Sequence, residues 1–281
     1  MALEIKLLDL GDIELESSFL VQARDCGSNA RVPTFGYLIL GDDPILIDSG
    51  FRNPEIMSTL GMRGLQYREQ LIENQLAKYD LTFKDVRYLL HTHLHIDHAG
   101  KDDQFPMSTT VVINRRELEY AVSGLMGGQY PAPDIKHLID RLHTPRALRF
   151  LDLEGSDGIE IIPGVVCVAA GGHTEGSMNI LVETAEGIAN ICGDVIYDIS
   201  DQLLDPFHGV LEMEPAVTGN HGTTKRQEQL AMKKIVNSCR FVCPIHDRPG
   251  VIERGEVVGR MHDKIPGPIT KSFPRRRWFA A

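Results

Sequence analysis

The amino-acid sequence predicts an α/β protein with two similar layers. Short apolar runs rich in β-branched residues alternate with segments of helical periodicity along the 281-residue chain. The alternation has the same form in both halves, and no long polar linker separates them. Because a domain usually spans about 100–200 residues, this length forms one large or two small domains. The missing linker favours a single domain over residues 1–281, with a C-terminal tail from about residue 265.

Strand and helix signals follow one another closely in the first half. Two apolar runs, Tyr37–Leu40 and Ile45–Ile47, flank the turn sequence Gly41–Pro44 and predict a hairpin. Apolar residues recur with helical spacing over Arg68–Tyr79, which predicts a helix there. The next apolar run, Arg87–Leu90, predicts a strand that leads directly into a histidine-rich turn.

A strand and the start of a second helix come next. The run Thr110–Ile113 predicts the strand. Asn114 can cap the free N–H groups of a first helical turn, and Glu117 stands at the third position after it. The sequence therefore predicts a helix that begins after Asn114.

The second half shows the same style of organisation. Thr224 and Gln227 form a capping box, which predicts a helix to about Ser238. Apolar runs separated by glycine-containing turns predict five strands, at Ile159–Ile162, Val165–Ala169, Met178–Val182, Ile188–Ile191 and, as the final one, Arg240–Cys243.

Two segments have no clear period. Residues 123–150 and 198–222 are rich in Gly, Pro and His, and we expect long loops or helical lids there. Such segments often carry binding residues. His208 and His221 lie in the second segment, and the sequence leaves open whether they line a pocket or are exposed.

Composition excludes several classes of protein. The net charge of −10 argues against a nucleic-acid or anionic-membrane surface, which requires a basic face. The sequence contains no run of 18 or more apolar residues, so it predicts no transmembrane helix. The N-terminus lacks the basic region of a signal peptide. Five scattered cysteines fit reduced thiols better than a disulfide framework. We therefore expect a cytoplasmic protein that binds neither nucleic acid nor membrane.

The strongest functional signal is a cluster of metal-ligand residue types. His93, His95, Asp97 and His98 fall within six residues, directly after an apolar strand. Side chains alternate along an extended chain, so His93 and His95 project to the same side. Imidazole and carboxylate groups suit zinc and related ions. Ordinary core or surface histidines are the weaker interpretation, because three neighbouring imidazoles would repel one another when protonated.

Three further candidate ligands stand after predicted strands. His173, Asp194 and His246 each follow an apolar β-run. One such residue in a turn is weak evidence, but the repetition is informative. Together with the first cluster they make five histidines and two aspartates. A single zinc ion takes three or four protein ligands, so seven candidates are enough for two metals.

These residues resemble the metallo-β-lactamase superfamily, from about Leu7 to about His246. Asp48-Ser-Gly50 matches the early Asp-x-Gly turn of that superfamily. The chain looks most like the N-acyl-homoserine lactonase group, whose members hydrolyse small lactones. These lactonases share the sequence motif of Thr92–Gly100 and carry a tyrosine at the position of Tyr197. The resemblance implies one metallo-β-lactamase-like hydrolase domain, an αββα sandwich of two mixed β-sheets flanked by helices.

The resemblance also implies the roles of the candidate ligands. His93, His95 and His173 would hold a first divalent metal ion, and Asp97, His98 and His246 a second, with Asp194 bridging the two. Zinc is the expected metal, with manganese, iron or cobalt as alternatives. Asp48 would either accept an N–H from a ligand imidazole or cap its turn, and His91 would either support the site or end its strand.

The implied activity is the hydrolysis of a small lactone resembling N-acyl-homoserine lactone. A hydroxide bridging the metals would attack the carbonyl, Tyr197 would stabilise the oxyanion, and Asp97 would pass a proton to the leaving alkoxide. The alternatives are hydrolysis of another ester, a thioester or a cyclic amide, and a metal-stabilised binding protein without activity. The expected partner is a small-molecule lactone or ester; the sequence leaves a homodimer open.

Overall fold

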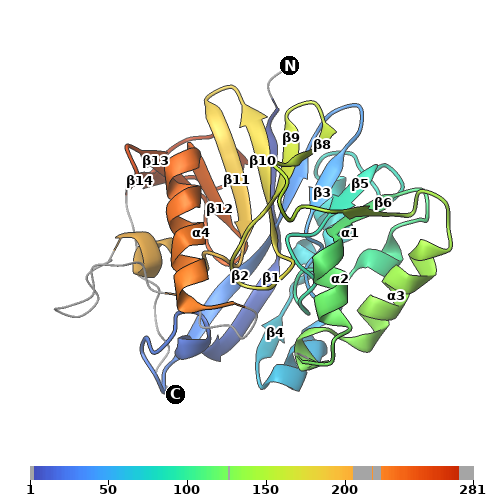
Figure 1. Cartoon of the computed structure of the whole chain (residues 1–281), viewed down its shortest axis with the longest axis horizontal. Helices are drawn as coiled ribbons and strands as arrows, with labels where there is room; N and C mark the ends of the chain where they lie inside the picture. Colours follow the sequence, from blue (N-terminus) through green and yellow to red (C-terminus); the bar gives the residue numbers. More distant parts are fainter. Residues whose placement is uncertain (1–2, 126, 205–216, 218–222, 272–281) are drawn as a thin grey trace.

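Two mixed β-sheets pack face to face and carry helices on their outer faces (Figure 1). The computed structural model describes residues 3–125, 127–204, 217 and 223–271. Its layers, helix–sheet–sheet–helix, form the αββα sandwich that the resemblance implies. The fold class expected from the sequence is therefore confirmed.

The first sheet contains eight strands, seven of them in the order β15-β1-β2-β3-β5-β6-β7, with β4 also paired to β1. The hairpin β2–β3 is antiparallel, as predicted, whereas β3, β5, β6 and β7 run parallel to one another. The strands are β1 (Ile5–Glu16), β2 (Asn29–Ile39), β3 (Ile45–Ile47), β4 (Arg63–Leu65), β5 (Tyr88–Leu90), β6 (Thr110–Asn114), β7 (Leu148–Leu151) and β15 (Lys264–Ile265).

The second sheet contains seven strands in the order β14-β13-β12-β11-β10-β9-β8. Neighbouring strands are antiparallel except β11 and β12, which run parallel. The strands are β8 (Ile159–Ile162), β9 (Val165–Ala169), β10 (Met178–Thr184), β11 (Gly187–Gly193), β12 (Phe241–Pro244), β13 (Gly250–Glu253) and β14 (Glu256–Arg260).

Helices cover the outer face of each sheet (Figure 1). The helices α1 (Ile72–Ala77), α2 (Arg115–Ala121) and α3 (Ala132–Leu142) pack on the first sheet. The helix α4 (Lys225–Ser238) packs on the second, with Met232 and Ile235 fully buried against it. Burial of these apolar helix faces provides most of their stability, since helices this short are marginal alone.

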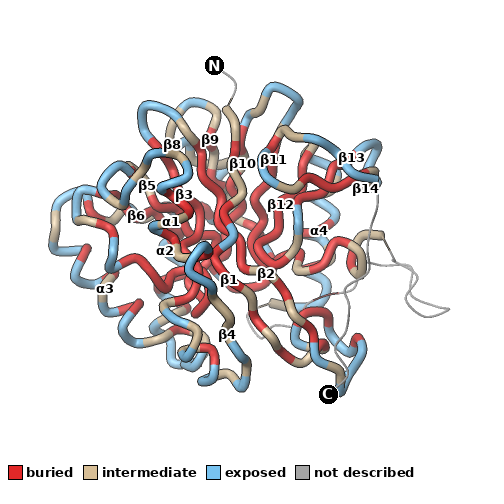
Figure 2. The backbone as a smooth tube through the Cα atoms, turned by 180° about the vertical axis from the view of Figure 1, so that it is seen from behind, coloured by how far each residue is buried: buried red, intermediate tan, exposed pale blue. Residues whose placement is uncertain are grey.

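The main core lies between the two sheets, where buried backbone runs through both layers (Figure 2). Strand β3 shows how the sequence builds it. Ile45 and Ile47 point into the inter-sheet core, while Leu46 between them faces the outer helices. This alternation follows from the period of two along a strand, and it explains why a strand buried on both faces is apolar throughout.

Three sequence expectations need correction. Residues 68–79 are not one helix: Leu71 is extended between a short 3-10 turn, Arg68–Gln70, and α1. The helix α2 does begin after Asn114, but that side chain makes no cap and instead donates to Glu154 and to the Gly176 carbonyl. Strand β12 is not the last, because β13 to β15 follow it.

The C-terminal part of the described chain is paired. Strand β15 adds to the edge of β1, and Thr270 forms an isolated bridge with Arg260. Among the described residues, no helix has both the length and the apolar composition needed to span a membrane.

Candidate metal centre

All seven candidate ligands follow the ends of strands. His93, His95, Asp97 and His98 lie in the turn after β5, and His173 follows β9. Asp194 comes directly after β11, and His246 lies two residues after β12. The two sheets therefore deliver these side chains to one edge of the sandwich.

Three imidazoles converge in the first group. Nε2 of His173 lies 3.1 Å from Nε2 of His93 and 3.1 Å from Nδ1 of His95. All three side chains are buried. With Asp194 they form a group whose ligand atoms lie within 4.8 Å of one another, which is the spacing that a single ion can bridge.

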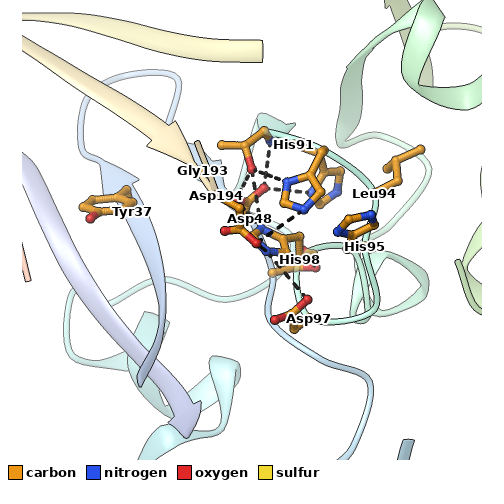
Figure 3. A network of polar contacts seen from close by, with 12 residues as sticks. Tyr37, Asp48, His91, Leu94, His95, Asp97, His98, Gly193 and Asp194 are labelled. Carbon is orange, nitrogen blue, oxygen red and sulfur yellow. Dashed lines mark hydrogen bonds and ion pairs between the residues drawn. The ribbon is translucent and has the colours of Figure 1, made fainter. Parts of the chain in front are cut away.

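The second group consists of Asp97, His98 and His246. Nε2 of His246 lies 3.3 Å from Oδ2 of Asp97, and Nε2 of His98 lies 3.7 Å from Oδ1 of the same carboxylate. Figure 3 shows Asp97 and His98 beside Asp194. These three residues also bring their ligand atoms within 4.8 Å of one another.

Asp194 stands between the two groups. Its Oδ2 lies 3.5 Å from Nε2 of His173 and 3.3 Å from Nε2 of His98. Its Oδ1 lies 3.5 Å from Nε2 of His246. One carboxylate therefore faces ligand atoms of both groups, the arrangement that a bridging ligand requires.

The two groups differ in their electrostatics. Burial and neighbouring imidazoles hold the pKa of His93 and of His95 well below the usual value, and burial above all lowers the pKa of His173 to about 4. These three side chains are therefore neutral at pH 7, the form of imidazole that binds metal.

The second group is rich in opposite charges. Burial opposes protonation of His98 and His246, but the carboxylates of Asp194 and Asp97 outweigh it. The pKa of His98 rises well above its usual value, and that of His246 rises to about 9. A divalent cation would take the place of these protons between the same carboxylates.

The residues fit a pair of metal ions. Nε2 of His98 and Oδ1 of Asp194 are buried and lack a hydrogen-bond partner. A buried polar atom left unpaired costs about 1–3 kcal/mol, so both need a partner that a cation would supply. Five imidazoles and two carboxylates match the nitrogen and oxygen ligands of zinc-type ions. The two groups support a dinuclear site for divalent metal ions.

Asp48 supports this site rather than only capping its turn. Its Oδ2 accepts the Nδ1–H of His98 at 2.9 Å and the hydroxyl of Thr92 at 2.7 Å. Its Oδ1 accepts the backbone N–H of Thr92 at 2.9 Å. Because Nδ1 of His98 is held by Asp48, the other ring nitrogen faces Asp97 and Asp194 (Figure 3).

His91 lies one layer further from the candidate ligands. Its Nε2 lies 2.9 Å from Asp102, and its Nδ1 lies 3.4 Å from Asp48. Burial alone would lower its pKa, but Asp102 and Asp48 raise the pKa of His91 to about 9. Of the two roles that the sequence left open, the contacts favour support, since a protonated His91 would hold Asp48 in place.

Tyr197 lies beside both groups at the wall of a cavity. Its ring stacks on His246 with centroids 5.0 Å apart and lies 5.7 Å from the ring of His173. Burial and the carboxylates of Asp194 and Asp97 raise its pKa well above the usual value, so the phenol keeps its proton.

The cavity measures about 270 Å³. His95, Asp97, Tyr197 and His246 line it on the side of the candidate ligands. Apolar side chains from β1, β2 and the 3-10 turns Ser17–Phe19 and Pro54–Leu60, with Leu20 directly after the first turn, form much of the remaining wall. Those from the four elements are Ile13, Leu15, Phe19, Val32, Met57 and Leu60.

Sequence reasoning did not assign some parts of this region. Glu117, interpreted only as a helix-start signal, is buried and accepts hydrogen bonds from Leu94, Tyr130 and Thr174. No sequence pattern predicts the cavity wall, because its residues come from separate strands and turns. His208 and His221 lie outside the described residues.

Comparisons with known proteins agree with this geometry. The family model described as the metallo-beta-lactamase superfamily matches residues 30–237. An N-acyl homoserine lactonase of Bacillus cereus is 27% identical over 222 residues, covering 74% of this chain and 80% of that protein. The N-acyl homoserine lactonase AiiB of Rhizobium rhizogenes is 29% identical over 205 residues, covering 65% of this chain and 72% of that protein.

Solved structures show the same fold. An N-acyl homoserine lactone hydrolase with the product N-hexanoyl-L-homoserine at its catalytic metal center has a TM-score of 0.65 at 20% identity, covering 84% of this chain and 89% of that one. AidC, a dizinc quorum-quenching lactonase, has a TM-score of 0.63 at 17% identity, covering 91% and 92%. At these identities the likeness concerns the fold alone. With a family model matched over most of its length, this chain belongs to the metallo-beta-lactamase superfamily and is a metal-dependent hydrolase.

Proposed function

We propose that the protein is a lactonase that opens a small lactone of the N-acyl-homoserine lactone type, using two divalent metal ions, with zinc as the expected metal. The observation that carries this proposal is the position of Asp194 between two ligand groups beside a cavity with an apolar wall. The curated relatives named as N-acyl homoserine lactonases support the choice of substrate.

The seven residues divide between the ions in the proposal. His93, His95 and His173 hold the first ion, the second is held by Asp97, His98 and His246, and Asp194 bridges them. Two such ions, when bound, lower the pKa of a water molecule so that it becomes a nucleophile, and they polarise the substrate carbonyl.

In the proposal, Tyr197 stabilises the developing negative charge. Its phenol stays protonated because burial and two neighbouring carboxylates raise its pKa. A protonated phenol at the cavity wall can donate a hydrogen bond to the carbonyl oxygen of a bound lactone. Its stacking on His246 limits rotation of the ring, so this donor is held in place before substrate binds.

In the proposal, Asp97 transfers a proton. One carboxylate oxygen lies near His98 and the other near His246, and the residue also lines the cavity. In the proposal, a carboxylate oxygen of Asp97 receives the proton of the attacking water and returns it to the alkoxide oxygen that leaves the opened ring. The proton balance then closes, since the products are a carboxylic acid and an alcohol.

The cavity supports a small substrate with an apolar part. Its volume of about 270 Å³ is near the lower end of ligand pockets, which span roughly 300–1,000 Å³. The apolar wall fits an acyl chain, because burial of each CH₂ group contributes about 0.8 kcal/mol. The acidic net charge of −10 would not favour a polyanionic substrate.

A substrate screen tests this proposal. Purified protein loaded with zinc should be assayed on lactones, simple esters, thioesters, phosphotriesters and β-lactams, with chelator-treated protein as the control. We expect the highest kcat/KM on an N-acyl-homoserine lactone, and loss of this activity after chelation. A higher kcat/KM on a thioester or a cyclic amide would contradict the lactonase assignment and identify the alternative hydrolase.

A further inference from the structure

We propose that Glu117 is a positioning residue for the first metal site. It joins the two chain segments that carry His93, His95 and His173. The inference rests on the proposed assignment of these three histidines to one ion. It adds a residue that does not line the cavity and makes no hydrogen bond to a ligand side chain in the described part of the chain, yet determines where the ligands stand.

The carboxylate of Glu117 is buried in the first turn of α2, with 1% of the residue exposed. Its Oε1 accepts the backbone N–H of Leu94 at 2.9 Å and the hydroxyl of Tyr130 at 3.0 Å. Its Oε2 accepts the hydroxyl of Thr174 at 2.6 Å. Three donors from three separate segments thus meet on one buried carboxylate.

These donors are direct neighbours of the ligands. Leu94 lies between His93 and His95, so a hydrogen bond to its N–H holds the backbone from which both imidazoles project. Thr174 follows His173 directly. One carboxylate therefore connects two segments that are far apart in the sequence but share the first ion.

The backbone at His173 needs such support. Its φ of 68° lies in the left-handed region, which residues with a side chain seldom adopt. The hydroxyl of Thr174 donates to Glu117, so Ser177 donates its own hydroxyl to Thr174, and the backbone N–H of Thr174 donates to Ser177. These contacts hold the strained turn in one conformation.

Tyr130 extends the same support to the ring of His95. The two rings meet edge to face, with centroids 5.0 Å apart and an angle of 61° between their planes. Because its hydroxyl is bound to Glu117, Tyr130 has a defined position against His95. Glu117 thus acts on His95 through both the backbone and the ring.

The second group is held by other residues. Nδ1 of His98 is bound to Asp48, and Nδ1 of His246 lies 2.9 Å from the carbonyl oxygen of Pro33. Within the described part of the chain, the hydrogen bonds of Glu117 reach the segments of the first group only. A change at Glu117 should therefore act on one metal site and spare the other.

The substitution Glu117→Gln tests this selectivity. Glutamine has the same shape, but it replaces one acceptor oxygen with a donor, so at least one of the three donors would face an N–H group. Loss of a residue that orients metal ligands commonly costs 10- to 100-fold in metal affinity. We expect a loss of about this size at the first site, with the affinity of the second site unchanged.

Metal binding provides a readout that does not depend on turnover. Wild-type and Glu117→Gln proteins are stripped of metal and titrated with zinc in competition with a chromophoric chelator. Crystals grown at one zinc equivalent then show, by anomalous scattering, which site is filled. We expect the variant to lose the anomalous peak at His93, His95 and His173. Glu119→Gln on the same helix is the matched control, because Glu119 is exposed and, within the described ranges, forms an ion pair with Arg116 alone.

The outcomes separate the inference from the proposed function. A wild-type protein that binds fewer than two zinc ions contradicts the proposed dinuclear site. If wild-type protein binds two ions, equal weakening of both sites in Glu117→Gln, or no weakening, overturns the role of Glu117. Should that variant not fold, Tyr130→Phe removes one donor and keeps the ring. It should weaken the first site alone by a smaller factor, and unchanged affinity would overturn the inference.

Discussion

Asp194 and His246 face each other across 3.5 Å, with Oδ1 of the carboxylate directed at Nε2 of the imidazole. The other oxygen of Asp194 faces His173 and His98 instead. The carboxylate is buried, and the imidazoles around it hold its pKa well below the usual value although burial alone would raise it. Asp194 is therefore ionised and faces both ligand groups.

This relationship predicts unequal effects of ligand substitutions. Asp194→Ala should reduce bound metal more than His93→Ala or His246→Ala, because Asp194 is the one residue of the seven that is proposed to hold both ions. Metal content after dialysis, measured by mass spectrometry, should be near two ions per chain in the wild type and below one in Asp194→Ala. Each histidine variant should keep about one ion. Equal losses in all three variants would contradict the bridging role.

The second prediction concerns Tyr197. Loss of one oxyanion donor costs about 10²–10³ in kcat in a well-studied protease, and here the metal ions would share the task. Tyr197→Phe should therefore lower kcat on a lactone by roughly 3- to 100-fold. Metal content should not change, since the phenol is not a proposed ligand. Wild-type kcat in this variant would show that the phenol is not the donor.

Much of the centre could be predicted from the sequence because each candidate ligand follows an apolar strand. Strand ends meet at one edge of a sheet, so residues such as His173 and His246, distant in sequence, could be expected to meet. The role of Glu117 could not be predicted in the same way. An acid in the first turn of a helix is an ordinary capping signal, and its partners come from three segments that only the folded chain brings together.

The fold shows the same contrast: elements set by local sequence patterns could be predicted, and elements that depend on tertiary contacts could not. The apolar runs of β3 and β11 follow simple strand patterns and were predicted. Strand β1 is not predicted from the sequence. Its register shifts between Asp9 and Asp12, and this shift interrupts the alternation of buried residues. The helix expected over 68–79 is interrupted at Leu71, which is extended. Side-chain hydrogen bonds fix the segments on either side: Gln75 accepts the backbone N–H of Asp9 and donates to the backbone carbonyl of Glu69.

The third prediction concerns stability. The guanidinium of Arg141 is fully buried and donates to backbone carbonyls, among them Asp102, Phe105 and Thr109. Arg141→Met would remove these donors and leave the carbonyl oxygens of Phe105 and Thr109 unpaired, so the free energy of unfolding should fall by about 2–4 kcal/mol. Lys136→Met, an exposed position on the same helix, should change it by no more than about 0.5 kcal/mol. Denaturant titration measures both; equal effects would refute the structural role.

The fourth prediction concerns the cysteines. All five are free, and Cys26 is the exposed one. Burial raises the pKa of Cys167 and of Cys239 to about 12, so these thiols stay protonated at pH 8, whereas the thiolate is the reactive form. A chromogenic disulfide should label one thiol rapidly in native protein and all five after denaturation. Cys26→Ser should abolish the rapid phase; a persistent phase would contradict this assignment. The cytoplasmic location stays a prediction.

The most direct test of the dinuclear lactonase is a metal titration followed by the rate of lactone opening. Metal-free protein receives zinc in steps, and proton release from an N-acyl-homoserine lactone is recorded in a pH-stat. The account predicts that the rate rises until two zinc ions are bound per chain, and that Asp194→Ala stays nearly inactive at every step. A full rate with one ion, or wild-type activity in Asp194→Ala, would contradict it.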